Sequence, residues 1–146
     1  MKPRLNVITL AVTDLEKALS FYRDGLDLPS QGIIGTEFKG DATHPSGAVA
    51  FFELQGGLIF ALYPRTELAK DASREPGTPN STEFSLGYAV NSKEEVDALL
   101  QKAEAAGAVM TAGPHDRPWG IYSGYFEDLD GHLWEVIWNP GLEVKD

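Results

Sequence analysis

The chain repeats one order of predicted elements in its two halves. Residues 5–12 alternate along the chain and are rich in β-branched side chains, which is typical of a strand, and a helical pattern follows. The same strand and helix return later in the chain. Residues 48–60 then lie in register with residues 122–134, and Gly57 matches Gly131 in a hairpin turn. Each half therefore predicts a strand, a helix and three further strands.

Both predicted helices carry end signals. In the first half, Thr13 and Asp14 offer an N-cap, Glu16 is placed to close a capping box on Thr13, and Gly25 is the expected residue after the helix. The second half begins with a predicted strand over 84–90. The matching signals there are Ser92, Glu95 and Gly107. Its predicted apolar helix face consists of Val96, Leu99, Leu100 and Ala103.

Composition excludes several function classes. The chain has 12 Lys and Arg against 22 Asp and Glu, a net charge of −10. That charge argues against nucleic acid and an anionic membrane as partners, because both require a basic surface. The absence of cysteine excludes disulfides, thiolate zinc sites and a cysteine nucleophile.

Targeting and membrane segments are not expected. The apolar stretch within residues 1–10 is too short for a signal-peptide core, and the other apolar runs are too short to span a bilayer. We therefore expect a soluble, cytoplasmic protein.

Two signatures resemble the vicinal oxygen chelate superfamily: ITLAVTDLEKALSFYRDGLDL at 8–28 and GYFEDLDGHLWEVIWNP at 124–140. This superfamily includes glyoxalase I, extradiol dioxygenases, fosfomycin resistance enzymes and bleomycin resistance proteins. The resemblance implies an α+β fold of two tandem βαβββ modules whose sheets curve into a cup around one site, often in a homodimer. The expected organisation is one glyoxalase-like domain over 1–146, with modules 5–64 and 84–140 and a connector over 65–83.

The resemblance also implies metal ligands on the first and last strands of each module. Transferred by register, the four positions are Val7, Ala61, Ser85 and Glu135. Glu135 alone supplies a strong donor, because valine and alanine have no donor atom and a neutral hydroxyl is a poor ligand. We therefore predict no metal cofactor, with a divalent metal at Glu135 as the alternative. His44, His115 and His132 are predicted to lie in loops or turns with surface roles.

Strand alternation predicts a cup lined by small side chains. Space left by small residues on a concave face favours a bound ligand, because close-packed interiors tolerate little void. The aromatic residues considered for its rim are Phe51, Phe52, Tyr63, Trp119, Tyr122, Tyr125 and Phe126. Arg65 and Arg117 could neutralise an anionic ligand, but a solvated surface role is expected for each. The predicted ligand-binding residues are Val7, Thr9, Ala61, Tyr63, Ser85, Trp119, Tyr122 and Glu135.

These observations favour a metal-independent protein that binds a small organic molecule, aromatic or cationic, in the cup. The alternative is a glyoxalase-like lyase, isomerase or dioxygenase-type enzyme in which Glu135 is catalytic, with or without a divalent metal. A third possibility is a vestigial cup on a structural protein. One fold hosts all three classes, so the site must decide between them.

Overall fold

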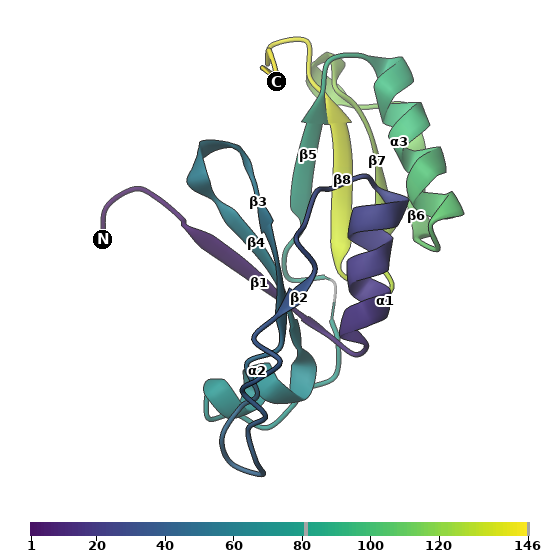
Figure 1. Cartoon of the computed structure of the whole chain (residues 1–146). Coiled ribbons are helices and arrows are strands. Elements are labelled where there is room, and N and C mark those ends of the chain that lie inside the picture. Colours follow the sequence, from purple (N-terminus) through teal and green to yellow (C-terminus); the bar gives the residue numbers. More distant parts are fainter. Residues whose placement is uncertain (81, 146) are drawn as a thin grey trace. The chain divides into compact units, whose positions relative to one another are not determined.

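Each half of the chain builds its own four-stranded mixed sheet in the computed structural model (Figure 1). The chain divides into a first unit, Met1–Thr78, and a second unit, Pro79–Asp146, and the structure describes residues 1–80 and 82–145. Ser81, which falls in the predicted connector, and Asp146 lie outside the described residues. The predicted α+β fold of two tandem βαβββ modules is confirmed.

The first unit follows the predicted order of a strand, a helix and three strands. Its sheet has the order β1-β4-β3-β2, in which β1 runs parallel to β4 and the other pairs are antiparallel. The elements are β1 (Val7–Val12), α1 (Leu15–Ser20), β2 (Ile33–Ile34), β3 (Val49–Glu53), β4 (Ile59–Pro64) and α2 (Arg65–Asp71).

The ends of α1 differ from the prediction. The N-cap is Asp14, whose side chain accepts a hydrogen bond from the Lys17 N–H at 3.1 Å, so the capping box predicted on Thr13 is wrong. After Ser20 the helix widens into a π-turn, Phe21–Gly25. The left-handed residue beyond it is Asp27, with φ 59°, and not Gly25. The wider turn lets two consecutive aromatic side chains, those of Phe21 and Tyr22, be buried.

An aromatic cluster joins α1 to its sheet. The Tyr22 ring lies 5.0 Å from the Phe60 ring and 6.0 Å from the Phe52 ring, in edge-on geometries that favour aromatic pairs. Because side chains alternate along a strand, the residues between these aromatic positions point to the opposite face of the sheet. That opposite face carries Phe51 and Ala61, which pair across β3 and β4.

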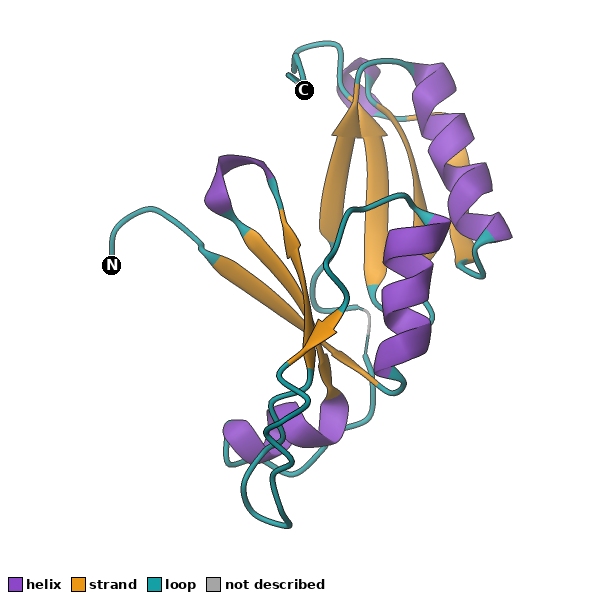
Figure 2. Ribbon diagram, in the orientation of Figure 1, coloured by secondary structure: helices purple, strands orange, loops and turns teal. Residues whose placement is uncertain are grey.

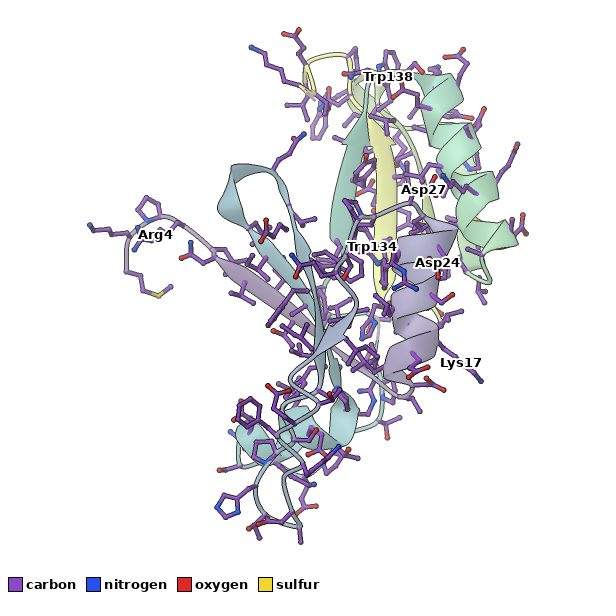
Figure 3. The ribbon with its side chains drawn as sticks, viewed as in Figure 1. Arg4, Lys17, Asp24, Asp27, Trp134 and Trp138 are labelled. Atoms are coloured by element: carbon purple, nitrogen blue, oxygen red, sulfur yellow. The ribbon has the colours of Figure 1, made fainter. Side chains whose placement is uncertain are left out.

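The second unit repeats the plan with the sheet order β5-β8-β7-β6. Its elements are β5 (Leu86–Val90), α3 (Lys93–Ala105), β6 (Val109–Asp116), β7 (Tyr122–Glu127) and β8 (Leu133–Trp138). The first strand therefore starts two residues later than predicted. Trp134 and Trp138 lie near opposite ends of β8 (Figure 3).

The predicted end signals of α3 are confirmed. Ser92 caps the helix by accepting a hydrogen bond from the Glu95 N–H at 3.1 Å, and Gly107 has a φ of 111° just beyond it. The helix runs along the sheet (Figure 1) and packs mainly on β7. A Cβ placed on Gly124 would lie 2.6 Å from Leu100 Cδ1, so α3 approaches β7 at the closest distance that glycine permits. The buried side chains of α3 are those of Val96, Leu100 and Ala103.

The repeated hairpins keep the predicted register. Gly57 and Gly131 have φ values of 80° and 83°. The Leu54 N–H donates to the Leu58 carbonyl at 2.8 Å, and the Asp128 N–H donates to the His132 carbonyl at 2.9 Å. One element was not predicted: α2 directly follows β4, inside the segment expected to be a connector (Figure 2). No helix in the described part of the chain has the length and hydrophobicity needed to cross a membrane.

Candidate functional site

Four predicted site residues share one face of the first sheet. Thr9 pairs with Ala61 across β1 and β4, and Val7 and Tyr63 lie on the same face by alternation. Val7 is 49% exposed, whereas Ala61 is buried at the centre of the sheet. This face, opposite α1, therefore carries small and aliphatic side chains next to the exposed ring of Phe51.

A cleft of ≈ 620 Å³ opens on the β2–β3 side of this face. The Ser30 hydroxyl donates to the Phe51 carbonyl at 2.8 Å and accepts from the Gly32 N–H at 3.1 Å, which fixes the loop that forms one wall. Ile34 and Phe51 remain 45% and 41% exposed. The lining residues are Pro29, Ser30, Gln31, Gly32, Ile34, Phe51 and Glu53.

The Tyr63 side chain anchors a loop. Its hydroxyl donates to the Ser46 carbonyl, and the Ser46 N–H in turn donates to the Glu67 carboxylate at 3.2 Å. Burial raises the pKa of Tyr63, and the negative charges of Asp71 and Glu67 raise it further. Its polar end therefore stabilises the approach of residues 35–47 to α2.

The second unit places a polar cluster on the sheet face opposite α3. Glu135 pairs with Tyr125 across β7 and β8, and its carboxylate accepts a hydrogen bond from the Ser123 hydroxyl at 2.9 Å. Ser123 is fully buried. Burial raises the pKa of Tyr125, and the charge of Glu135 and its hydrogen bond with the phenol raise it further, against the effect of Arg117. We call Arg117, Ser123, Tyr125 and Glu135 the polar cluster.

Arg117 lies against this cluster, contrary to its predicted solvated role. Its guanidinium carbon is 5.2 Å from the centroid of the Tyr125 ring, within the range of a cation–π contact. The Arg117 N–H donates to the Ile121 carbonyl at 2.7 Å, which closes the β6–β7 turn and fixes the backbone of the arginine. The Nε atoms of Arg65 and Arg117 are buried without a hydrogen-bond partner among the described residues.

The other predicted site residues in this unit do not join the polar cluster through any described contact. Ser85 precedes β5 and is exposed. Trp119 is 92% exposed in the β6–β7 turn, where its φ of 64° lies in the left-handed region. The Tyr122 hydroxyl donates to Asp97 of α3 at 2.7 Å, which assigns it to the helix side of the sheet. The pKa of Tyr122 is raised chiefly by that hydrogen bond.

The donor set at the four implied ligand positions does not fit a metal site of the usual kind. Val7 and Ala61 have no donor atom, and Ser85 offers one neutral hydroxyl. Glu135 supplies the one carboxylate, and its Oε1 already accepts a hydrogen bond from the Ser123 hydroxyl. Within residues 1–80 and 82–145, no three His, Asp or Glu side chains gather to hold a metal ion.

The three histidines differ from one another. His44 is exposed in a loop with Asp41, as predicted. The pKa of the Asp41 carboxyl is lowered, chiefly because the carboxylate accepts hydrogen bonds from the backbone N–H groups of His44 and Thr43. His115 lies in β6 opposite Ser123, so its predicted loop position is wrong. The predicted surface role of His132 is also wrong, because its side chain is only 13% exposed and its Nδ1 lies 2.7 Å from Asp128.

Sequence reasoning named Tyr125 among the rim aromatics but did not link Tyr125, Ser123 or Arg117 to Glu135. The repeat aligns Tyr125 opposite Glu135 on neighbouring strands, and that register was sufficient to place Tyr125 beside the carboxylate. Ser123 follows from the same alternation. Arg117 lies in a turn, so no strand period identified it. In the first unit the cleft residues Phe51 and Glu53 also follow from alternation, whereas its loop wall does not.

These features define an α+β protein of two βαβββ modules, with a cleft in the first unit and the polar cluster in the second. The chain belongs to the Glyoxalase/Bleomycin resistance protein/Dioxygenase superfamily, whose family model matches residues 4–136. No curated protein matches the chain.

Solved structures show the same fold. A glyoxalase-related enzyme from Fulvimarina pelagi has a TM-score of 0.81 at 24% identity, covering 98% of this chain and 93% of that one. A lactoylglutathione lyase from Agrobacterium tumefaciens has a TM-score of 0.69 at 23% identity, covering 99% and 100%. A fosfomycin resistance protein from Listeria monocytogenes has a TM-score of 0.66 at 24% identity, covering 95% of each chain. At these identities the likeness extends to the fold alone.

Proposed function

We propose that this protein binds a small organic molecule, without a metal ion, in the cleft of the first unit. The observation that carries the proposal is the cleft itself, whose volume of ≈ 620 Å³ lies within the range of about 300–1,000 Å³ typical of small-molecule sites. The Ser30 hydrogen bonds hold its wall in place before any ligand binds, which lowers the entropy cost of binding.

The lining favours a molecule with a flat apolar body and a positive charge. The exposed faces of Phe51 and Ile34 supply apolar area, and an aromatic ring stacks on Phe51. Glu53 is the one ionisable side chain among the lining residues, so the electrostatic preference is for a cation. The overall charge of −10 adds to that preference.

Thermal unfolding of the full chain tests this with benzyltrimethylammonium as the aromatic cation and benzyl alcohol as the neutral analogue. A ligand that binds only the folded state raises the melting temperature. We expect a concentration-dependent rise with the cation that is abolished in Phe51→Ala and reduced in Glu53→Gln. Phe84→Ala, which removes another half-exposed phenylalanine, is the matched control and retains the rise. An equal rise in Phe51→Ala and wild type overturns the proposal.

A separate experiment tests whether binding is independent of a metal ion. Ni²⁺, Zn²⁺, Fe²⁺ and Mn²⁺ are added separately to metal-stripped protein, and we expect none of them to raise its melting temperature. A rise that is present in the wild type and lost in Glu135→Gln would overturn the proposal that binding is metal-independent.

A second candidate is a glyoxalase-like enzyme that uses Glu135 as an acid–base group. The observation in its favour is the hydrogen-bonded carboxylate beside Tyr125, since paired titratable groups are typical of acid–base sites. Turnover of methylglyoxal with glutathione separates the two candidates. We expect none above background, and turnover that disappears in Glu135→Gln would establish the enzyme instead.

A further inference from the structure

The second unit holds a cation without an anionic partner. Some other basic side chains are paired: Arg23 with Asp24 at 2.9 Å, and Lys93 with Asp116 at 2.6 Å. Arg117 is adjacent to Asp116 in sequence, yet that carboxylate pairs with Lys93. Among the described residues Arg117 makes no ion pair, although the chain carries 22 acidic residues against 12 basic ones. Its charge is therefore available to a bound group.

The position of Arg117 is fixed from two sides. The hydrogen bond from its backbone N–H to Ile121 sets the turn, and its guanidinium lies over the Tyr125 ring. The Tyr125 phenol is in turn tied to Glu135, which Ser123 holds. A guanidinium supported on an aromatic face presents its edge, and thus its N–H donors, to whatever approaches in the plane of the group.

One of those donors has no acceptor. The Arg117 Nε is buried and makes no hydrogen bond among the described residues. An unsatisfied buried donor destabilises the free protein, and the cost is recovered when an acceptor is supplied. In the planar guanidinium, Nε–H and one Nη–H point to the same side as a fixed pair. Two parallel N–H donors in that arrangement match the two oxygens of a carboxylate.

We propose that Arg117 is a binding site for the carboxylate of a small organic molecule, with the Tyr125 ring as its support. The polar cluster then combines two charges with separate roles. Arg117 binds the anion by donating hydrogen bonds to it. Glu135 positions Tyr125, and its negative charge repels an anion that approaches the carboxylate. This site concerns the second unit and a ligand group of opposite charge to the one expected in the cleft, so it goes beyond the function proposed above.

Binding of benzoate to the full chain tests the site, followed by two-dimensional NMR titration, with benzylamine as the probe of opposite charge. We expect benzoate to shift the resonances of Arg117 and Tyr125, and benzylamine to leave them unchanged. In Arg117→Gln the dissociation constant for benzoate should rise about tenfold or more, the loss of one charge-assisted pair. Arg74→Gln removes the same charge from an exposed site and should bind benzoate as wild type does.

Two further variants keep the test decisive. Arg117→Lys retains the charge but not the paired donors, so we expect an intermediate affinity, and it carries the test if Arg117→Gln does not fold. Tyr125→Ala removes the supporting ring, so we expect it to weaken benzoate binding. Equal benzoate affinity in wild type and Arg117→Gln, or in wild type and Arg117→Lys if only that variant folds, overturns the proposal. The cleft is probed by a different molecule and by Phe51→Ala, so failure of either proposal leaves the other standing.

Discussion

The two units share a backbone plan and differ in the chemistry of one sheet face. In the first unit, the face opposite the helix carries Phe51 paired with Ala61. In the second unit, the same register positions carry Tyr125 paired with Glu135. Val49 likewise corresponds to Ser123. At each of these positions the second unit adds a polar group to a site that is apolar in the first.

The difference separates what the fold needs from what the site needs. Both faces are compatible with the same strand order, so neither the phenol nor the carboxylate is required to form the sheet. The helix-facing side of each sheet contributes buried apolar residues to the core, among them Phe52 and Leu62 in the first unit and Phe126 and Val136 in the second. Polar groups on a partly buried sheet face cost free energy unless they are hydrogen-bonded, and the Ser123 hydroxyl and the Glu135 carboxylate meet that requirement for each other.

The largest expected effect concerns the helix-facing side. Gly124 corresponds to Ala50 of the first unit, which is fully buried. In Gly124→Ala the added Cβ would lie 2.6 Å from Leu100 Cδ1 and 3.0 Å from the Ala112 carbonyl oxygen. Backbone atoms cannot move aside cheaply, so we expect a loss of about 3 kcal/mol in the free energy of unfolding, measured in urea. The reverse change, Ala50→Gly, should cost only about 1 kcal/mol.

An unchanged stability in Gly124→Ala would show that α3 can move away from β7, and the close approach would then not distinguish the units.

This part of the fold could be predicted from the sequence. The capping signals at Ser92 and Glu95, the apolar face of the second helix and the matched glycines of the hairpins all act locally, which is why pattern reasoning found them. The π-turn after α1 could not be predicted in this way, because the burial of Phe21 and Tyr22 together is decided by tertiary packing.

The next prediction converts the polar cluster toward its apolar counterpart. Glu135→Ala gives the second unit the residue of the first unit and leaves the buried Ser123 hydroxyl without its acceptor. We expect a loss of about 1–2 kcal/mol in the free energy of unfolding. Glu135→Gln retains an acceptor oxygen and should lose less than half as much. If both variants are equally stable, the Ser123 hydrogen bond contributes nothing and the cluster is not built around Glu135.

A third prediction uses pH to compare the two faces. Because the pKa of Tyr125 is raised in the folded state, its contribution to stability is fully present below pH about 10 and is lost as pH rises through the native pKa. Phe51, its counterpart, does not ionise. Tyr125→Phe should therefore lose stability less steeply than wild type between pH about 9 and 11, in urea titrations at each pH.

Glu135→Gln is the companion measurement. It removes one cause of the raised pKa, so we expect the alkaline loss of stability in this variant to be shallower than in wild type and steeper than in Tyr125→Phe. Parallel slopes in all three proteins would contradict the electrostatic link between the phenol and the carboxylate.

The candidate site was only partly within reach of the sequence. Alternation along the strands placed Val7, Thr9 and Ala61 on one face, and Glu135 on the matching face of the other unit, because a two-residue period is local information. The position of Arg117 depends on a turn whose conformation no period predicts. Tyr122 was predicted at a rim, yet its hydroxyl bonds to Asp97, since the start of β7 decides which face a residue joins.

The smallest expected effect compares two turns. At the first unit's β3–β4 turn, the left-handed positions are Gly56 and Gly57, with φ of 75° and 80°. At the second unit's β6–β7 turn, the left-handed positions are Trp119 and Gly120, with φ of 64° and 73°. A bulky side chain is strained there, and the Trp119 side chain is 92% exposed, so little packing offsets the strain.

Trp119→Asn should therefore raise the free energy of unfolding by about 0.5–1 kcal/mol in urea, because asparagine tolerates the left-handed conformation. Trp138→Asn, which removes an indole that is not in a left-handed position, is the control and should lose stability. A stabilised Trp119→Asn that also binds benzoate less tightly would show that the strain at this turn is retained for the ligand that Arg117 receives. A destabilised Trp119→Asn would show instead that the indole packs on the second unit.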